Sequence, residues 1–103
     1  RLPIGQSVVD AIVKLVRAGR PESTDLDVVR QRIAWGPGPR ASQAFMLAAR
    51  ARAIIQGRLA PSIDDVVELA GPILRHRMAV NFSARAEGVT VETVIAQMCA
   101  RIA

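Results

Sequence analysis

The sequence predicts an all-α domain, a small bundle of five or six helices with at most one short strand. Half of the residues are hydrophobic, but only three are aromatic: Trp35, Phe45 and Phe82. Alanine, valine, isoleucine and leucine dominate instead, and they recur at the three- and four-residue spacing of amphipathic helices. A chain of 103 residues forms one domain that buries roughly 60–65% of its unfolded surface without disulfides or metals.

Apolar spacing and turn residues predict the first two helices. The first helix covers Ser7–Arg17, with its first residue, a serine, as the N-cap, and it stops at Gly19-Arg20-Pro21. Asp25 or Asp27 is the expected N-cap of a second, shorter helix, which runs through Val28, Val29 and Ile33 and ends at Trp35-Gly36. These two helices form the N-terminal part of the bundle.

The third predicted helix is long and rich in alanine. It runs from Pro39 to about Gln56, and Gly57 closes it because glycine readily adopts the left-handed backbone of a helix end. The following segment is predicted to be extended. Leu59 or Ala60 is the place where we expect the single short strand.

The fourth predicted helix begins after Ser62, with two acidic residues, Asp64 and Asp65, in its first turn. Negative charge there is favourable because the helix N-terminus is partly positive. A proline interrupts this helix, and we expect it to start a fifth segment over Pro72–Met78.

The C-terminal part is predicted to hold one further helix. Residues Asn81–Gly88 show no helical spacing and are expected to be irregular. Thr90 is the expected N-cap of a last helix, which carries its apolar residues at helical spacing as far as Ile102.

The segment Trp35-Gly36-Pro37-Gly38-Pro39-Arg40 is the most informative part of the chain. Gly38 suits the N-cap of the third helix, and Pro39 suits its first position because no N–H is needed there. Arg40 then lies in the first turn, where a cation is disfavoured by roughly 0.3–1 kcal/mol. An arginine beside free helix N–H groups favours an anion site, and a solvated arginine explains the pattern equally well.

The charge and cysteine content narrow the function classes. The net charge is +5 and comes almost entirely from arginine, which fits a nucleic acid, an acidic surface or an anionic small molecule. Cys99 is the single cysteine, so an internal disulfide is excluded and a reducing, cytoplasmic location is expected. No apolar run is long enough to span a membrane. The chain begins with Arg1, which indicates a fragment or a processed product.

Catalytic patterns are missing from the sequence. There is no G-x-x-x-x-G-K-[ST] phosphate loop. One histidine, His76, and one cysteine make no zinc site, so no metal site is predicted. Asp64 and Asp65 are adjacent, and adjacent helical residues point apart, which favours helix capping over acid–base chemistry. We therefore expect no catalysis by this chain alone.

A small basic nucleic-acid-binding module is the alternative function. Its basic residues would be Arg50, Arg52, Arg58, Arg75, Arg77 and Arg85. The alanine-rich third helix offers few side chains that read bases, which counts against this reading. For Arg75-His76-Arg77, favourable charge at a helix C-terminus is preferred over a second anion contact. Trp35 is expected to cover the core rather than to stack on a ligand base.

Several motifs together resemble a known family. They are Ile4-Gly5-Gln6-Ser7-Val8, Arg30 to Gly36, Pro39-Arg40-Ala41-Ser42-Gln43-Ala44, Ala48 to Ala53, Gly57-Arg58, Asp64-Asp65-Val66 and Leu74-Arg75-His76-Arg77. In this order they resemble the C-terminal lid subdomain of MoxR-type AAA+ ATPases, over essentially the whole chain.

The resemblance implies a role for Arg40. In that family the arginine after the Gly-x-x-Pro turn is the sensor 2 residue, which supports ATP hydrolysis and is catalytic only in the full protein. Trp35 and Pro39 are further candidates for contact with the nucleotide. This chain has Pro37-Gly38 where the family usually has alanine or small polar residues.

The resemblance also implies a larger assembly. Residues 1–103 correspond to the lid, whereas the nucleotide-binding core that holds ATP and Mg²⁺ is absent from this sequence, and no ligand is expected to bind the fragment tightly. The implied partners are the core, the neighbouring subunits of a ring that is hexameric in the family, and a von Willebrand factor A-type protein in a chaperone-like role. The client, and the subunit whose nucleotide Arg40 would contact, stay open.

Overall fold

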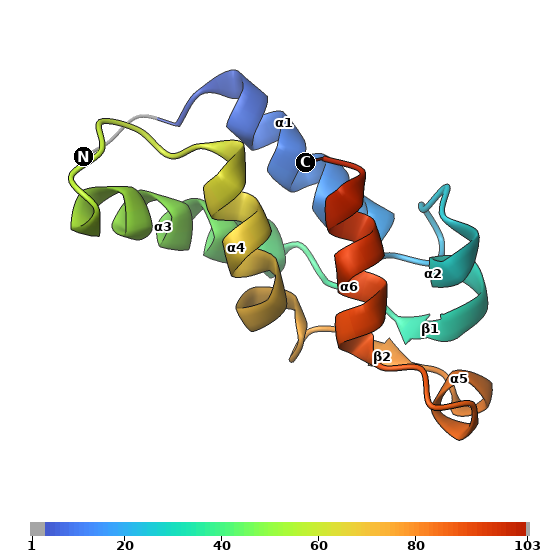
Figure 1. The fold of residues 1–103 in the computed structure, drawn as a ribbon. Coiled ribbons are helices and arrows are strands. Elements are labelled where there is room, and N and C mark those ends of the chain that lie inside the picture. Colours follow the sequence, from blue (N-terminus) through green and yellow to red (C-terminus); the bar gives the residue numbers. More distant parts are fainter. Residues whose placement is uncertain (1–3, 103) are drawn as a thin grey trace.

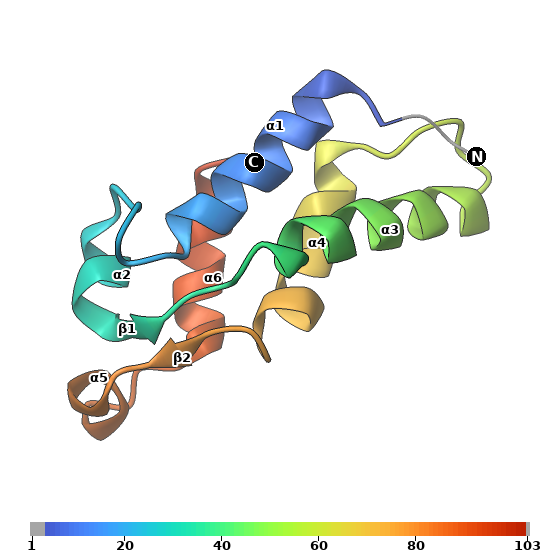
Figure 2. The same cartoon turned by 180° about the vertical axis from the view of Figure 1, so that it is seen from behind.

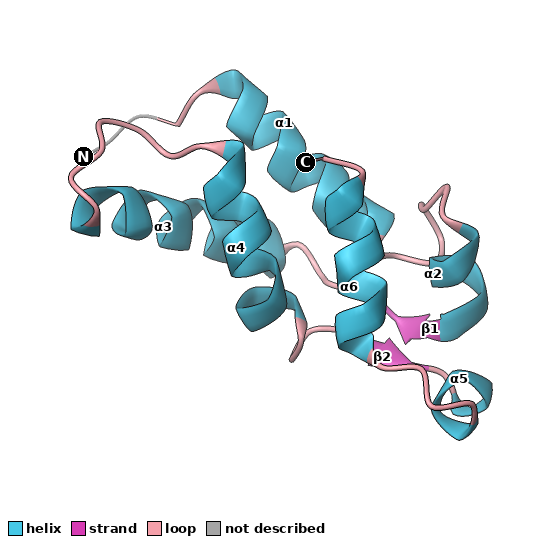
Figure 3. Cartoon of the chain, viewed as in Figure 1, coloured by secondary structure: helices cyan, strands magenta, loops and turns pink. Residues whose placement is uncertain are grey.

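Residues 4–102, which the computed structural model describes, form six helices and one two-stranded antiparallel sheet (Figures 1 and 3). In chain order the elements are α1 (Gln6–Ala18), α2 (Asp27–Arg32), β1 (Ile33–Trp35), α3 (Arg40–Ile55), α4 (Ile63–Leu74), β2 (Ala79–Val80), α5 (Phe82–Ala86) and α6 (Val91–Ala100). The domain is elongated, 44 × 22 × 21 Å. One end of α3 lies at one extreme, and the sheet and α5 lie at the other (Figure 1). The prediction of a small helical bundle is confirmed.

The hydrophobic core lies where α1, α3, α4 and α6 meet. Phe45 of α3 is fully buried at its centre. Other buried side chains around it are Val8, Ile12, Leu15, Val16, Val66, Ala70, Leu74, Val94 and Met98. Burial of each of the larger side chains contributes roughly 1.5–3 kcal/mol, so these four helices hold the domain together.

Before α4, the structure differs from the sequence prediction at several places. Helix α1 begins one residue earlier than expected, and its N-cap is Gly5, not Ser7. The second helix begins with Asp27 itself and its N-cap is Leu26, so the prediction of Asp25 or Asp27 as the cap is wrong. The helix stops at Arg32, because Ile33–Trp35 forms strand β1 instead of a helix end. This strand pairs with Ala79–Val80, and cross-strand hydrogen bonds outweigh the weak helical tendency of an isoleucine and a tryptophan. The expected strand at Leu59 or Ala60 is wrong.

The C-terminal half shows two further differences. Helix α4 continues through Pro72 to Leu74, so there is no separate segment over Pro72–Met78. The proline removes one backbone donor, and the buried face of the helix on either side compensates for that loss. The segment expected to be irregular contains the short helix α5, whose N-cap Asn81 accepts a hydrogen bond from the N–H of Ala84. The prediction of Thr90 as the N-cap of the last helix is confirmed.

The turn between α3 and α4 follows the prediction. Gly57 has a φ of +69°, the left-handed conformation expected of a helix-ending glycine. The N–H of Gly57 donates to the carbonyl of Ile54 at 3.0 Å, and that of Arg58 donates to the carbonyl of Ala53 at 2.8 Å. These two bonds satisfy the last carbonyls of α3 and direct the chain back toward α4.

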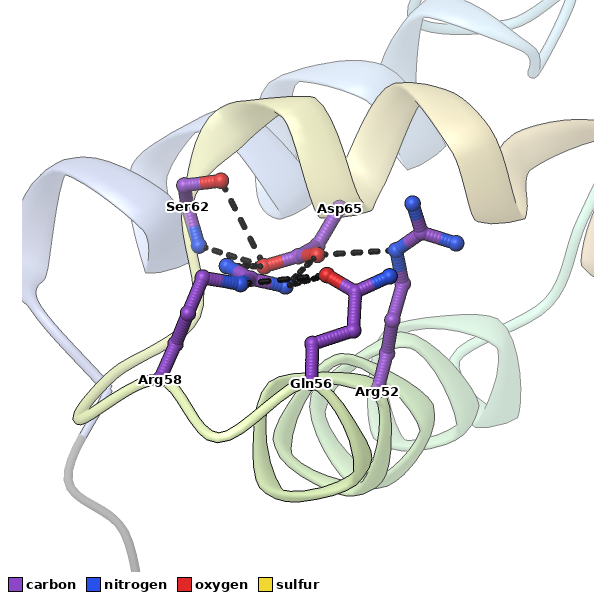
Figure 4. A network of polar contacts seen from close by, with 5 residues as sticks. All are labelled: Arg52, Gln56, Arg58, Ser62 and Asp65. Carbon is purple, nitrogen blue, oxygen red and sulfur yellow. Dashed lines mark hydrogen bonds and ion pairs between the residues drawn. The ribbon is translucent and has the colours of Figure 1, made fainter.

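A buried carboxylate joins the two helices that this turn connects (Figure 4). The side chain of Asp65 is only 2% exposed. It accepts a hydrogen bond from Arg52 Nε at 2.9 Å, two from Arg58 at 2.8 and 2.5 Å, and one from the N–H of Ser62 at 2.7 Å. The hydrogen bonds from Arg58, Ser62 and Arg52 hold the pKa of Asp65 well below its ordinary value. We call Arg52, Arg58, Ser62 and Asp65 the Asp65 cluster.

Candidate functional site

The segment between β1 and α3 is fixed tightly against the end of α1. A Cβ atom added to Gly36 would lie 2.1 Å from the carbonyl oxygen of Gly19, so only glycine fits there. Pro37 is fully buried, and its carbonyl accepts a hydrogen bond from Arg20 Nε at 2.7 Å. Pro37-Gly38 stands where the resembled family usually has alanine or small polar residues, and it lies in a loop that is firmly held against α1.

Arg40 begins α3, as the sequence predicted within one residue. Pro39 already has helical angles, φ −59° and ψ −28°, and the N–H of Ala41 donates to the carbonyl of Gly38 at 3.1 Å. The N-cap of α3 is therefore Pro39, one residue later than the Gly38 expected from the sequence, and Arg40 is the first residue of the helix. The first turn contains no acidic residue, and Arg40 is exposed. Its guanidinium lies near the partly positive end of a 16-residue helix.

An open pocket of about 430 Å³ lies in front of this helix start. Its lining residues are Trp35, Gly36, Gly38, Pro39, Arg40, Ala41 and Arg77. All three residues proposed from the sequence as nucleotide contacts, Trp35, Pro39 and Arg40, therefore line one pocket. Trp35 is 55% exposed, so the expectation that it covers the core is wrong.

The sheet explains why Arg77 joins this pocket from a distant part of the chain. Trp35 pairs with Ala79 across the two strands. In an antiparallel pair, the residues after the first strand run beside the residues before the second. The loop that leaves β1 and the loop that enters β2 accordingly run side by side in both views (Figures 1 and 2). From the sequence, Arg77 was expected only at the end of a helix. The pairing of β1 with β2 is what brings it beside Trp35 and Arg40.

The pocket carries positive charge without a balancing carboxylate. No aspartate or glutamate lines it. Six other arginines in residues 4–102 form ion pairs, namely Arg30, Arg32, Arg52, Arg58, Arg75 and Arg101, but neither Arg40 nor Arg77 is among them. Two exposed guanidinium groups around one hollow suit a ligand with several anionic oxygens, because each group presents a planar fork of donors.

Three of the six arginines named for nucleic-acid binding form ion pairs within the domain. Arg52 and Arg58 bind the buried carboxylate of Asp65. Arg75 pairs with Glu92 at 3.2 Å. Of the two adjacent acids, Asp65 does more than cap the helix, because it accepts a hydrogen bond from the N–H of Ser62 and also forms ion pairs with two arginines. The Ser-x-x-Asp spacing of a capping box is the sequence signal that distinguishes this aspartate from its neighbour.

Other features of the described residues are less suited to such a ligand. A larger pocket of about 530 Å³ lies between α1 and α6, but two carboxylates, Asp10 and Asp25, are part of its lining, and Arg101 there already pairs with Asp25 at 2.5 Å. Within residues 4–102, no group of three histidine, cysteine, aspartate or glutamate residues is placed to hold a metal ion. None of the helices in that range is long and apolar enough to cross a membrane.

Known proteins resemble this chain in sequence and in structure. The AAA lid domain family matches residues 26–98, a range that includes Trp35, Arg40 and Arg77. Over 101 residues the chain is 34% identical to Chaperone MoxR1 of Mycobacterium tuberculosis, covering 97% of this chain and 27% of that protein. A crystal structure of a proposed ATPase from Cytophaga hutchinsonii is 31% identical with a TM-score of 0.88, covering 94% of this chain and 30% of that one. The chain thus spans less than a third of either relative.

Proposed function

Because the chain belongs to the AAA lid domain family, we propose that it serves as the lid of a MoxR-type AAA+ ATPase in which Arg40 is the sensor 2 residue. In this role Arg40 contacts the terminal phosphate of ATP held by a separate nucleotide-binding core. The observation that carries the proposal is the exposed Arg40 guanidinium, which has no ion-pair partner among residues 4–102 and lines the pocket at the start of α3.

The chemistry of arginine supports this role. Its guanidinium stays charged at any physiological pH and binds phosphate oxygens in a fixed planar geometry. A phosphate sensor also needs a rigid support, since its signal is a change in position. Gly36 and Pro37 supply that support through their contacts with Gly19 and Arg20.

The proposed mechanism uses this chain for binding and movement. Bound ATP, with its Mg²⁺, supplies the phosphoryl group that is transferred to water, and the proposal assigns the phosphate loop, the metal ligands and the attacking water to the core. Arg40 stabilises the negative charge on the terminal phosphate. When that charge leaves, Arg40 loses its partner, and the lid turns relative to the core. Because one pair of guanidinium groups cannot replace a phosphate loop, we expect the isolated chain to bind ATP weakly.

The assembly implied by the family belongs to the same proposal. We propose that the parent protein forms a ring, a hexamer, in which each lid contacts its own core and a neighbouring subunit. A chaperone-like role in the cytoplasm, together with a von Willebrand factor A-type partner, completes the proposal. Its support is the likeness to Chaperone MoxR1, which the chain matches at 34% identity.

Substitution of Arg40 in the full-length protein tests the proposed role. We expect Arg40→Ala to lower the rate of ATP hydrolysis at least tenfold, which corresponds to about 1.4 kcal/mol of transition-state stabilisation. Gln43→Ala is the matched control, because Gln43 is an exposed residue one turn along the same helix. The circular dichroism spectrum of both variants should match that of the wild type. Wild-type turnover in a folded Arg40→Ala protein contradicts the proposal.

A further inference from the structure

We propose that Arg77 is a second phosphate-binding residue, which with Arg40 forms a two-arginine clamp on the polyphosphate of one nucleotide. The inference rests on the proposed function and extends it to a residue from a different part of the chain. Both arginines are exposed and line the same pocket, and its lining contains no aspartate or glutamate.

The backbone around Arg77 is held in place from both sides. Ala79, two residues later, pairs with Trp35 across the sheet, and the N–H of Asn81 donates to the carbonyl of Arg32 at 2.7 Å. On the other side, the N–H of Arg77 itself donates to the carbonyl of Leu74 at 2.9 Å. The position of Arg77 beside the loop that leads to Arg40 is thus set by hydrogen bonds.

The side chain of Arg77 is anchored at one nitrogen and keeps its other donors. Its Nη1 donates to the carbonyl of Ile73 at 2.9 Å, near the C-terminus of α4. A guanidinium has five N–H donors, so this bond orients the group and leaves Nε and Nη2 for another partner. An anchored arginine loses less side-chain freedom when it binds an anion than a freely rotating one does.

The adjacent arginine shows what a purely structural role looks like. Arg75 lies two residues earlier in the same turn, but its Nε pairs with Glu92 at 3.2 Å and it does not line the pocket. Arg77 has no ion pair within residues 4–102. Two cations that face one hollow repel each other, and a ligand with several phosphate oxygens relieves that repulsion. A polyphosphate therefore fits the pair better than a ligand with a single charge does.

The test is the equilibrium binding of a fluorescent ATP analogue to the full-length protein. We expect Arg77→Ala to weaken binding about tenfold, or about 1.4 kcal/mol, and Arg75→Ala to change it less than twofold. Arg77→Gln keeps a side-chain donor but removes the charge, so it should lose nearly as much affinity as Arg77→Ala. Inorganic triphosphate should compete with the analogue less effectively in both Arg77 variants than in the wild type. If Arg77 only stabilises the end of α4, its variants should have a lower thermal midpoint, but triphosphate should compete with the analogue as well as it does in the wild type.

The outcomes separate the clamp from the lid proposal. If Arg40→Ala impairs hydrolysis while both Arg77 variants bind the analogue like Arg75→Ala, the clamp is wrong and the sensor role of Arg40 stands. If Arg40→Ala also behaves like the wild type, the proposed function fails and the clamp fails with it. Weaker binding in both Arg77 variants, with a normal circular dichroism spectrum, supports the clamp.

Discussion

Two regions of this molecule use the same side chain for opposite purposes. In the Asp65 cluster, Arg52 and Arg58 share one buried carboxylate, which balances one of their two positive charges. In the pocket, Arg40 and Arg77 are exposed, and neither has an ion-pair partner in residues 4–102. The contrast teaches that the role of an arginine here depends on whether the fold supplies a carboxylate. In the Asp65 cluster the fold supplies one and the arginines join two helices, whereas the lining of the pocket contains none.

The Asp65 cluster should give the larger effect on stability. We expect Asp65→Ala to lower the free energy of unfolding by about 3 kcal/mol, because Arg52 and Arg58 would lose the buried carboxylate that both of them bind. Asp64→Ala is the control, since Asp64 is an exposed acid in the same turn and should contribute no more than about 1 kcal/mol. Denaturant unfolding of the 103-residue chain measures both variants. If both variants lose the same free energy of unfolding, the buried carboxylate of Asp65 contributes no more to stability than the exposed one of Asp64.

The loop that supports the pocket should give the next effect. We expect Gly36→Ala to destabilise the fold by about 2 kcal/mol, because the new methyl group would overlap the carbonyl of Gly19. Gly38→Ala provides the control, since a Cβ there meets nothing within 4 Å. The thermal midpoint of each variant is the measurement. A Gly36→Ala protein as stable as Gly38→Ala would show that the loop is looser than the structure indicates.

The smallest expected effect is the part of the pH dependence of stability that Asp65 contributes. The folded-state pKa of Asp65 is lowered, so its stabilising contribution is complete above the unfolded pKa, about 3.9, and falls as the pH drops toward the folded value. We expect the wild type to lose about 1 kcal/mol more than Asp65→Asn between pH 6 and pH 3. The free energies of unfolding of the two proteins across this range test it. Parallel pH profiles would mean that the carboxylate of Asp65 is not held in its charged form.

Local signals in the sequence were enough to place α3 and the residue that begins it. Gly38 and Pro39 mark the helix start, and Gly57 marks its end, each through backbone preferences that act within one turn. The position of Arg40 follows from these signals by counting. The candidate site could therefore be found in part without a structure.

Contacts between distant parts of the chain were not predictable in the same way. The strands β1 and β2 contain three and two residues, too few to show an alternating pattern. Without their pairing, nothing in the sequence brings Arg77 to the pocket. The partners of Asp65 were missed for a related reason, because a run of arginines does not reveal which of them meets a buried acid after folding.

The contact between Gly19 and Gly36 has a mechanical consequence. Here two stretches of bare backbone meet, with no side chain between them to absorb a displacement. A movement of Gly36 toward α1 would therefore press directly on the backbone at the end of that helix. The junction between the two segments therefore resists compression. A small movement of the loop before α3 would be transmitted to α1 and would turn that helix as a rigid body.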